Sequence, residues 1–151
     1  MTPNLFMQIG LGTGLIVATI IISVILISLA IDSLLPLANR LSRGSERLET
    51  MLVLIATTTW FVFVITVNVW LWAGAFLVLN VFGNLEEALY FSLVCFTTLG
   101  FGDIILSTEW RLLSGFTATA GFILFGLGTA FLYEIMSRFY NRTRSRRDKK
   151  H

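Results

Sequence analysis

The chain has 151 residues, of which 56% are hydrophobic and 13% are charged, and its mean hydropathy is +0.81. A soluble protein of this size needs far more polar surface, so the composition excludes a soluble globular domain. One cysteine, Cys95, excludes an internal disulfide, and one histidine, His151, leaves no histidine cluster for a metal. The net charge of +2 is concentrated near the C-terminus and gives no reason to expect a nucleic-acid partner.

Charged residues are missing from four stretches, and the lengths of these stretches predict the architecture. The stretches cover residues 1–31, 50–85, 88–102 and 112–133. A hydrocarbon core of about 30 Å takes roughly 20 apolar residues in a helix, so three of the stretches predict membrane crossings. We therefore expect an all-α integral membrane protein with three transmembrane helices. The start of the chain lacks the basic residues of a signal peptide, so no cleavage is expected.

The N-terminal apolar run, residues 11–31, predicts an extra membrane helix within 1–36. Asp32 and Pro36 suit a helix end near the interface. This helix is expected to lie peripherally, on the lipid-facing side of the subunit. The polar stretch 37–49 contains three arginines and predicts a cytoplasmic linker.

The second apolar run, residues 50–82, predicts an outer helix that is too long for one perpendicular crossing. Its 33 residues would reach about 50 Å at 1.5 Å per residue, so the helix must tilt, protrude or end early. Trp70 and Trp72 are candidates to mark its outer interface, and Asn68 predicts an interhelical hydrogen bond. The last run, residues 112–133, predicts an inner helix over 110–137 that crosses once.

A shorter apolar stretch, residues 85–96, lies between these two helices and is too short to cross. Such a segment is typical of a re-entrant helix, which is tolerated at membrane depth where protein surrounds it. Asn84, with Glu87 three residues later, has the pattern of an N-cap with a capping box, and Glu86 adds negative charge to the first turn. The sequence therefore predicts a re-entrant helix that begins at residue 85.

The positions of the basic residues predict the orientation. The linker has three arginines and the segment 138–151 has seven basic residues, so Arg111 is the one basic residue elsewhere. Cytoplasmic segments are enriched in Lys and Arg. We therefore expect the N-terminus outside, the C-terminus in the cytoplasm and the re-entrant helix in the outer half of the membrane.

The segment that follows the re-entrant helix carries the most specific motif. It reads Thr97, Thr98, Leu99, Gly100, Phe101, Gly102 and Asp103. This segment resembles T-T-[VIL]-G-[YF]-G-D, the selectivity-filter signature of tetrameric potassium channels. The resemblance extends over about residues 83–133 and includes 120–127, a stretch similar to the inner helix of bacterial two-transmembrane potassium channels.

The resemblance implies a homotetramer in a bacterial inner membrane that passes K⁺ down its gradient, with no cofactor besides the permeant ion. Residues 50–137 would form the pore domain, in which the ion is held by the carbonyls of Thr98, Leu99, Gly100 and Phe101. The side chains of Leu99 and Phe101 would pack outward as a cuff. The chemistry agrees, because a ring of backbone carbonyls can replace the hydration shell of a cation. Gly100 and Gly102 tolerate the backbone dihedrals that such a ring requires.

The surroundings of the filter depart from the pattern of that family. Tyr90 and Val94 stand where relatives often carry an aromatic residue and a glutamate that bond the aspartate after the filter. Tyr90 can bond Asp103 whereas Val94 cannot, and Leu106 replaces a frequent proline. We therefore expect altered filter stability with an unchanged ladder of carbonyls.

Carboxylates gather around the expected outer mouth. They are Glu86, Glu87, Asp103 and Glu109, and together with Arg111 they give a charge of −3 per chain. A tetramer would then carry at most −12 at its mouth, if all of these groups are ionised. Such a ring would concentrate cations at the entrance.

Two features leave alternatives open. Gly121 is either a gating hinge or a small residue that permits close helix packing. The basic segment 138–151 is either a solvated anchor that fixes the topology or a binding site for anionic lipid headgroups.

The remaining observations narrow the function. No membrane run carries regularly spaced arginines, which excludes a voltage-sensor helix. No nucleophile–base pair or metal cluster supports an enzyme. The sequence therefore predicts a potassium-selective channel. Two rivals are a non-selective cation channel of the same fold and a non-conducting regulatory membrane subunit.

Overall fold

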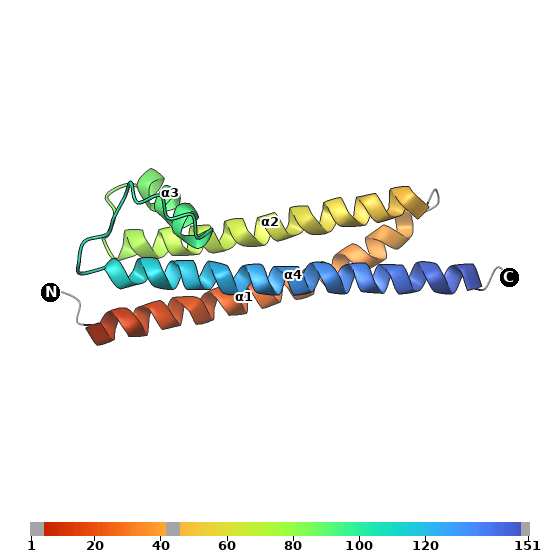
Figure 1. The fold of residues 1–151 in the computed structure, drawn as a ribbon, viewed down its shortest axis with the longest axis horizontal. Coiled ribbons are helices and arrows are strands. Elements are labelled where there is room, and N and C mark those ends of the chain that lie inside the picture. Colours follow the sequence, from red (N-terminus) through yellow and green to blue (C-terminus); the bar gives the residue numbers. More distant parts are fainter. Residues whose placement is uncertain (1–4, 42–45, 149–151) are drawn as a thin grey trace. The chain divides into compact units, whose positions relative to one another are not determined.

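The structure, a computed structural model, describes residues 5–41 and 46–148. Within these ranges the chain forms no strand, and its four helices are α1 (Leu5–Leu41), α2 (Glu46–Val78), α3 (Leu85–Phe96) and α4 (Arg111–Asp148) (Figure 1). Three of them are long and apolar enough to cross a membrane, over Leu5–Ile31, Thr50–Val78 and Arg111–Ser137. The predicted all-α fold with three transmembrane helices is confirmed, and the chain is an integral membrane protein.

The ends of α1 and α2 correct the predicted boundaries of the linker 37–49. α1 continues through Pro36 to Leu41, and α2 begins at Glu46 rather than at residue 50. A proline removes one backbone hydrogen bond from a helix, but here it does not end the helix. The Arg, Glu and Leu residues of this stretch are good helix formers, which explains why the helices continue beyond the apolar runs. Residues 42–45, in the middle of the predicted linker, lie outside the described residues.

The inner helix is also longer than predicted. It was expected over 110–137, whereas α4 begins at Arg111 and continues to Asp148. The predicted tail 138–151 is therefore helical over most of its length. Its side chains and the backbone of residues 149–151 lie outside the described part of the chain.

The outer helix, predicted over 50–82, ends earlier, in a turn built around Asn80. Asn80 has a φ of 54°, a left-handed conformation in which asparagine is enriched. The N–H of Val81 donates to the carbonyl of Phe76 at 2.9 Å, and the N–H of Asn80 donates to the carbonyl of Leu77 at 2.9 Å. These two bonds form a Schellman motif, which satisfies the last carbonyls of the helix. The run therefore ends early, at Val78, but α2 also begins four residues before the predicted start and has 33 residues.

The chain divides into two compact units, which are described separately. The first contains residues 1–24 and 65–125, and the second contains residues 25–64 and 126–151. Helices α1, α2 and α4 each contribute a segment to both units, whereas α3 and the loop that follows it belong to the first.

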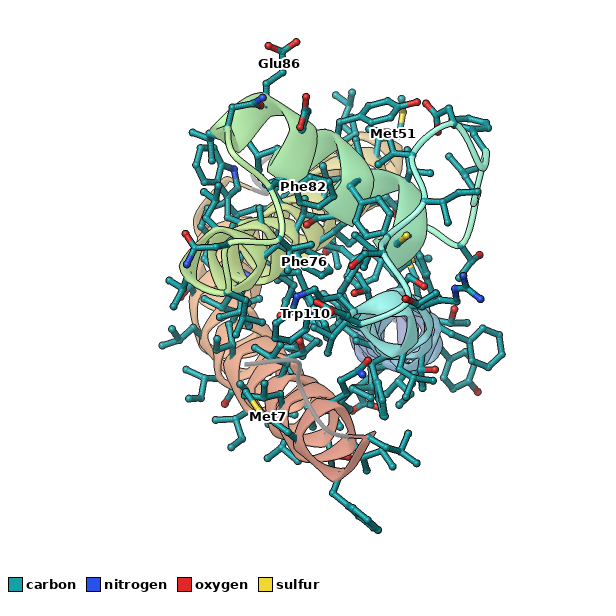
Figure 2. All side chains as sticks on the ribbon, turned by 90° about the vertical axis from the view of Figure 1, so that its left-hand side faces the viewer. Met7, Met51, Phe76, Phe82, Glu86 and Trp110 are labelled. Carbon is teal, nitrogen blue, oxygen red and sulfur yellow. The ribbon has the colours of Figure 1, made fainter. Side chains whose placement is uncertain are left out.

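In the first unit, an aromatic cluster attaches α3 to the end of α2. The rings of Phe76 and Phe91 meet edge to face with centroids 5.4 Å apart, and Phe82 packs against them at 5.8 and 5.2 Å. Figure 2 shows Phe76 and Phe82 beneath α3 in the interior of this unit. Each such aromatic pair stabilises the fold by about 0.5–1.5 kcal/mol in addition to the free energy of burying its surface. The cluster therefore fixes where α3 lies along α2.

Side-chain hydrogen bonds tie α1 to α2 in the same unit. Asn68 Nδ2 donates to Ser23 Oγ at 3.0 Å, and Trp72 Nε1 donates to Thr19 Oγ1 at 3.1 Å. We call these four residues the α1–α2 seam. The interhelical bond expected of Asn68 is confirmed. Trp72 is fully buried, so its side chain does not face a membrane interface as expected, whereas Trp70 is half-exposed.

In the second unit, α1, α2 and α4 share a small apolar core. It consists of Ala30, Val53, Phe131 and Ile135. Trp60 Nε1 donates to the carbonyl of Leu26 at 3.0 Å, which links α2 to α1 here as well. Phe61 of α2 lies directly on Gly128 of α4, where a Cβ would overlap its ring. α1 is therefore a packed element of both units.

Candidate functional site

The site begins at the N-terminus of α3, which starts at Leu85 as predicted. Asn84 has extended dihedrals (φ −139°, ψ 158°), and its side-chain oxygen accepts a hydrogen bond from the N–H of Glu87 at 2.8 Å. The predicted N-cap is confirmed. Glu86 and Glu87 lie exposed in the first turn, and Figure 2 shows Glu86 pointing away from the rest of the unit. Negative charge at this end of a helix is favourable.

The chain turns back on itself at the C-terminal end of α3. The N–H of Thr97 donates to the carbonyl of Leu93 at 3.0 Å, and the N–H of Thr98 donates to the carbonyl of Cys95 at 2.9 Å. The hydroxyl of Thr97 also donates to the Leu93 carbonyl, at 2.7 Å. The last carbonyls of the helix are thus satisfied by the first two residues of the motif, and this fixes the motif rigidly to α3.

The carbonyl of Val94 is the central acceptor of this turn. It accepts the N–H of Leu99 at 3.0 Å and the N–H of Gly100 at 3.3 Å. The Thr97 hydroxyl lies 3.4 Å from the same oxygen. Sequence reasoning considered Val94 only as a side chain that cannot bond Asp103, and so it missed the role of the Val94 backbone. No sequence signal marks that role, because every residue type has this carbonyl.

The backbone of residues 97–103, which we call the filter segment, has a positive φ at every second residue. Thr98 has a φ of 60°, Gly100 of 55° and Gly102 of 76°, whereas Leu99 and Phe101 between them have negative φ. Glycine adopts positive φ without steric cost. Thr98 does not, because a β-branched residue in this region is a conformational outlier that costs about 1–3 kcal/mol. The strain at Thr98 is a feature that the sequence did not reveal.

The filter segment presents its large side chains at the surface of the single chain. Leu99 is 59% exposed and Phe101 is 65% exposed. Within one chain, therefore, the expected cuff around the carbonyls is not formed. Leu106, the residue that replaces a proline, is buried instead.

Tyr90 and Asp103 lie together as expected. The Tyr90 hydroxyl donates to Asp103 Oδ2 at 2.5 Å, which connects α3 to the residue after the filter glycine. This hydrogen bond lowers the pKa of Asp103 below its usual value and raises the pKa of Tyr90. Both groups are exposed, so solvent screens the interaction.

The position of Gly121 bears on its two alternatives. Gly121 is buried in α4, and a Cβ built on it would overlap the carbonyl oxygen of Phe96, the last residue of α3. This contact supports the alternative in which Gly121 permits close packing of α4 against the end of α3. The role of Gly121 as a hinge stays a prediction.

The remaining predicted residues lie on the surface. Glu109 and Arg111 are exposed, as are Glu86 and Glu87. Within residues 5–41 and 46–148, no group of three or more His, Cys, Asp or Glu side chains could hold a metal ion.

A family model described as an ion channel matches residues 50–138, which is more than half of the chain. The match covers α3, the filter segment, nearly all of α2 and α4 as far as Arg138, and it leaves α1 outside. No curated protein matches the chain, and no solved structure does.

Proposed function

This chain belongs to the ion-channel family, and we propose that it is a K⁺-selective channel that works as a homotetramer. The observation that carries the proposal is the alternating handedness of the filter segment, with positive φ at Thr98, Gly100 and Gly102. In a strand with φ of constant sign, successive carbonyls point to opposite sides. When the sign of φ alternates from one residue to the next, successive carbonyls turn toward the same side. A cation that has lost its water needs such a row of oxygens.

The residues of the filter segment have distinct roles in this proposal. The carbonyls of Thr98, Leu99, Gly100 and Phe101 hold K⁺, and the Thr98 hydroxyl adds a ligand at the inner end. The C-terminal end of α3, which has a partial negative charge, favours a cation in the space below the filter.

A single chain supplies one strand of the filter, so several copies must complete the ring. The exposed side chains of Leu99 and Phe101 support this, because apolar side chains of this size next to an ion path need cover. Copies arranged around a rotation axis would bury them and close the ring of carbonyls at the same time. We propose four copies, as the sequence motif implies.

Orientation follows from the distribution of basic residues. With the C-terminus in the cytoplasm, the carboxylates Glu86, Glu87, Asp103 and Glu109 surround the outer mouth and attract cations. The basic segment 138–151 then lies at the cytoplasmic surface of a bacterial inner membrane, where it can meet anionic lipid headgroups.

The reversal potential of the purified protein tests the proposal. The protein would be reconstituted in planar bilayers under opposed KCl and NaCl gradients, with barium as a blocker. We expect a current that reverses near the K⁺ equilibrium potential and that barium removes.

Two other results would replace the proposal. A clear current that reverses near zero would identify a non-selective cation channel of the same fold. A confirmed tetramer that stays silent across pH, voltage and lipid composition would identify a non-conducting membrane subunit.

A further inference from the structure

The helix α1 lies outside the family match, so its role has to come from its own contacts. Among residues 5–24, the buried ones are all small or polar: Gln8, Gly12, Thr19 and Ser23. Seven large apolar side chains of the same segment are exposed, among them Phe6 at 84%, and the other large apolar side chains are half-buried. Helix contacts within a bilayer use small and polar residues, whereas lipid meets the apolar ones. The face of α1 that carries these buried small and polar residues is therefore suited to contact with other helices.

The contact with α2 sets the position of α1. Ser23 and Thr19 accept hydrogen bonds from Asn68 and Trp72, both of which are fully buried. The two acceptors lie one helical turn apart on α1, and the two donors lie one turn apart on α2. A shift of one helix along the other by a turn would leave at most one acceptor opposite a donor, so the full α1–α2 seam favours one register of α1.

The contact with α4 is made by Gly12. The Phe116 ring of α4 packs so closely on Gly12 that a Cβ there would overlap three of its ring atoms. Gly10 and Gly14, on either side, have nothing within 4 Å of a Cβ. Of these three glycines, Gly12 is thus the one at which an added side chain would press on α4.

Phe116 is on the same helix, α4, as the residue that contacts the end of α3. It lies five residues before Gly121, which packs on the carbonyl oxygen of Phe96. At 100° per residue, five residues turn a helix by about 140°, so Phe116 and Gly121 lie on nearly opposite faces of α4. A push on the Phe116 face therefore presses the Gly121 face against the end of α3, directly before Thr97.

From these contacts we propose that α1 is a modulatory helix. Through the contact of Gly12 with Phe116, it sets how closely α4 packs against the end of α3, which directly precedes the filter segment. The inference rests on the proposed channel function. It assigns α1 a role in opening and closing the pore that the match to residues 50–138 does not include. The α1–α2 seam holds α1 on α2, and Gly12 is the residue through which α1 contacts Phe116 of α4.

The test is a set of valine substitutions in the full-length channel. Gly12→Val presses on Phe116, whereas Gly10→Val and Gly14→Val are matched controls on the same helix. We expect Gly12→Val to lower the open probability in symmetric KCl by at least about fivefold, the lower end of typical couplings between sites. The two controls are expected to stay close to the wild type. Phe116→Ala in the Gly12→Val background is expected to restore most of the open probability, because the collision is gone.

Thermal unfolding of the same detergent-purified variants separates modulation from a loss of fold. If Gly12→Val lowers the unfolding temperature but leaves the open probability unchanged, α1 is a structural helix and the proposal is wrong. Equal open probabilities for the three valine variants, or no rescue by Phe116→Ala, would also overturn it. A wild-type protein without current would contradict the proposed function itself, and this outcome is distinct from a conducting wild type whose variants all behave alike.

Discussion

The filter segment and the α1–α2 seam are both held by hydrogen bonds, yet they use different groups of the chain. In the filter segment, two backbone N–H groups meet the carbonyl of Val94, and the large side chains stay at the surface. In the seam the backbone is ordinary helix, and the side chains of Asn68 and Trp72 make the bonds. The filter segment should thus be sensitive to backbone dihedral preferences, and the seam to the loss of single polar atoms.

The largest effect is expected from Gly100→Ala. Gly100 has a φ of 55°, where an L-residue costs about 1–2 kcal/mol, and a tetramer bears this cost four times. A Cβ at Gly100 would meet nothing within 4 Å in the single chain, so the dihedral angle is what opposes the substitution. We expect the K⁺-selective current to disappear, as measured by the current amplitude and, for any current that remains, by its reversal potential under opposed KCl and NaCl gradients.

Gly74→Ala is the matched control for this prediction. Gly74 lies within α2, also with nothing within 4 Å of a Cβ, but its backbone is helical. Alanine is favoured over glycine in a helix by about 1 kcal/mol, so current and selectivity should be retained. If Gly100→Ala retained its reversal potential as well, the backbone account of the filter would be wrong.

Gly121→Ala should have the next largest effect, and it sharpens the comparison because α4 meets a carbonyl of the helix that holds the filter segment. The obstacle is the backbone oxygen of Phe96, which cannot rotate away as a side chain can. We expect a loss of about 1–3 kcal/mol in the free energy of unfolding in detergent, the usual cost of overpacking. Gly126→Ala, with open space around its Cβ in the same helix, should be at least as stable as the wild type, by up to about 1 kcal/mol. A stable Gly121→Ala protein with altered gating would favour the hinge instead.

The same comparison shows what could be predicted from the sequence. The start of α3 was predictable because Asn84 and Glu87 act locally, within one helical turn. The bonds to the Val94 carbonyl and the positive φ of Thr98 were not, because neither depends on a side-chain type that the sequence displays. The early end of α2 had a signal in Asn80, a polar residue in an apolar run that favours left-handed turns.

The seam was predictable in kind but not in detail. An asparagine in an apolar run must find a partner, and Asn68 indicated this before its partner was visible. The partner, Ser23, lies 45 residues earlier in the chain. Nothing in the local sequence distinguishes it from other hydroxyl residues of the first helix. The contact of Phe116 with Gly12 is equally long-range, so the role of α1 could not be inferred from residues alone.

The seam itself can be tested by a double-mutant cycle of Ser23→Ala and Asn68→Ala. The expected coupling energy is about 0.6 kcal/mol and at most about 1.7 kcal/mol, the range of side-chain hydrogen bonds between membrane helices. Unfolding of the four proteins in detergent micelles measures it. Asn68→Ala combined with Thr119→Ala is the control, since the Thr119 hydroxyl bonds back to Gly115 in its own helix. Equal coupling in both cycles would show that the Asn68–Ser23 bond contributes nothing specific.

The smallest effect is expected from Tyr90→Phe, which removes a side-chain bond from a region that relies mainly on its backbone. The Tyr90 hydroxyl holds the pKa of Asp103 below its usual value. Its stabilising effect is therefore fully present above the ordinary pKa of the carboxyl group, and it is lost as the pH falls through the lowered value. Without the hydroxyl, the pKa of Asp103 returns toward its ordinary value. Protonation of Asp103 removes one of the carboxylates proposed to attract cations to the outer mouth, so the current should fall on external acidification. In Tyr90→Phe this fall should begin at a higher pH than in the wild type. The shift should be small, because both groups are exposed and screened by solvent.

Tyr133→Phe is the control, since it removes an exposed hydroxyl from α4. The pH at which its current falls should be the same as in the wild type. If the pH at which the current falls does not move in Tyr90→Phe, the Tyr90 hydroxyl does not set the ionisation of Asp103.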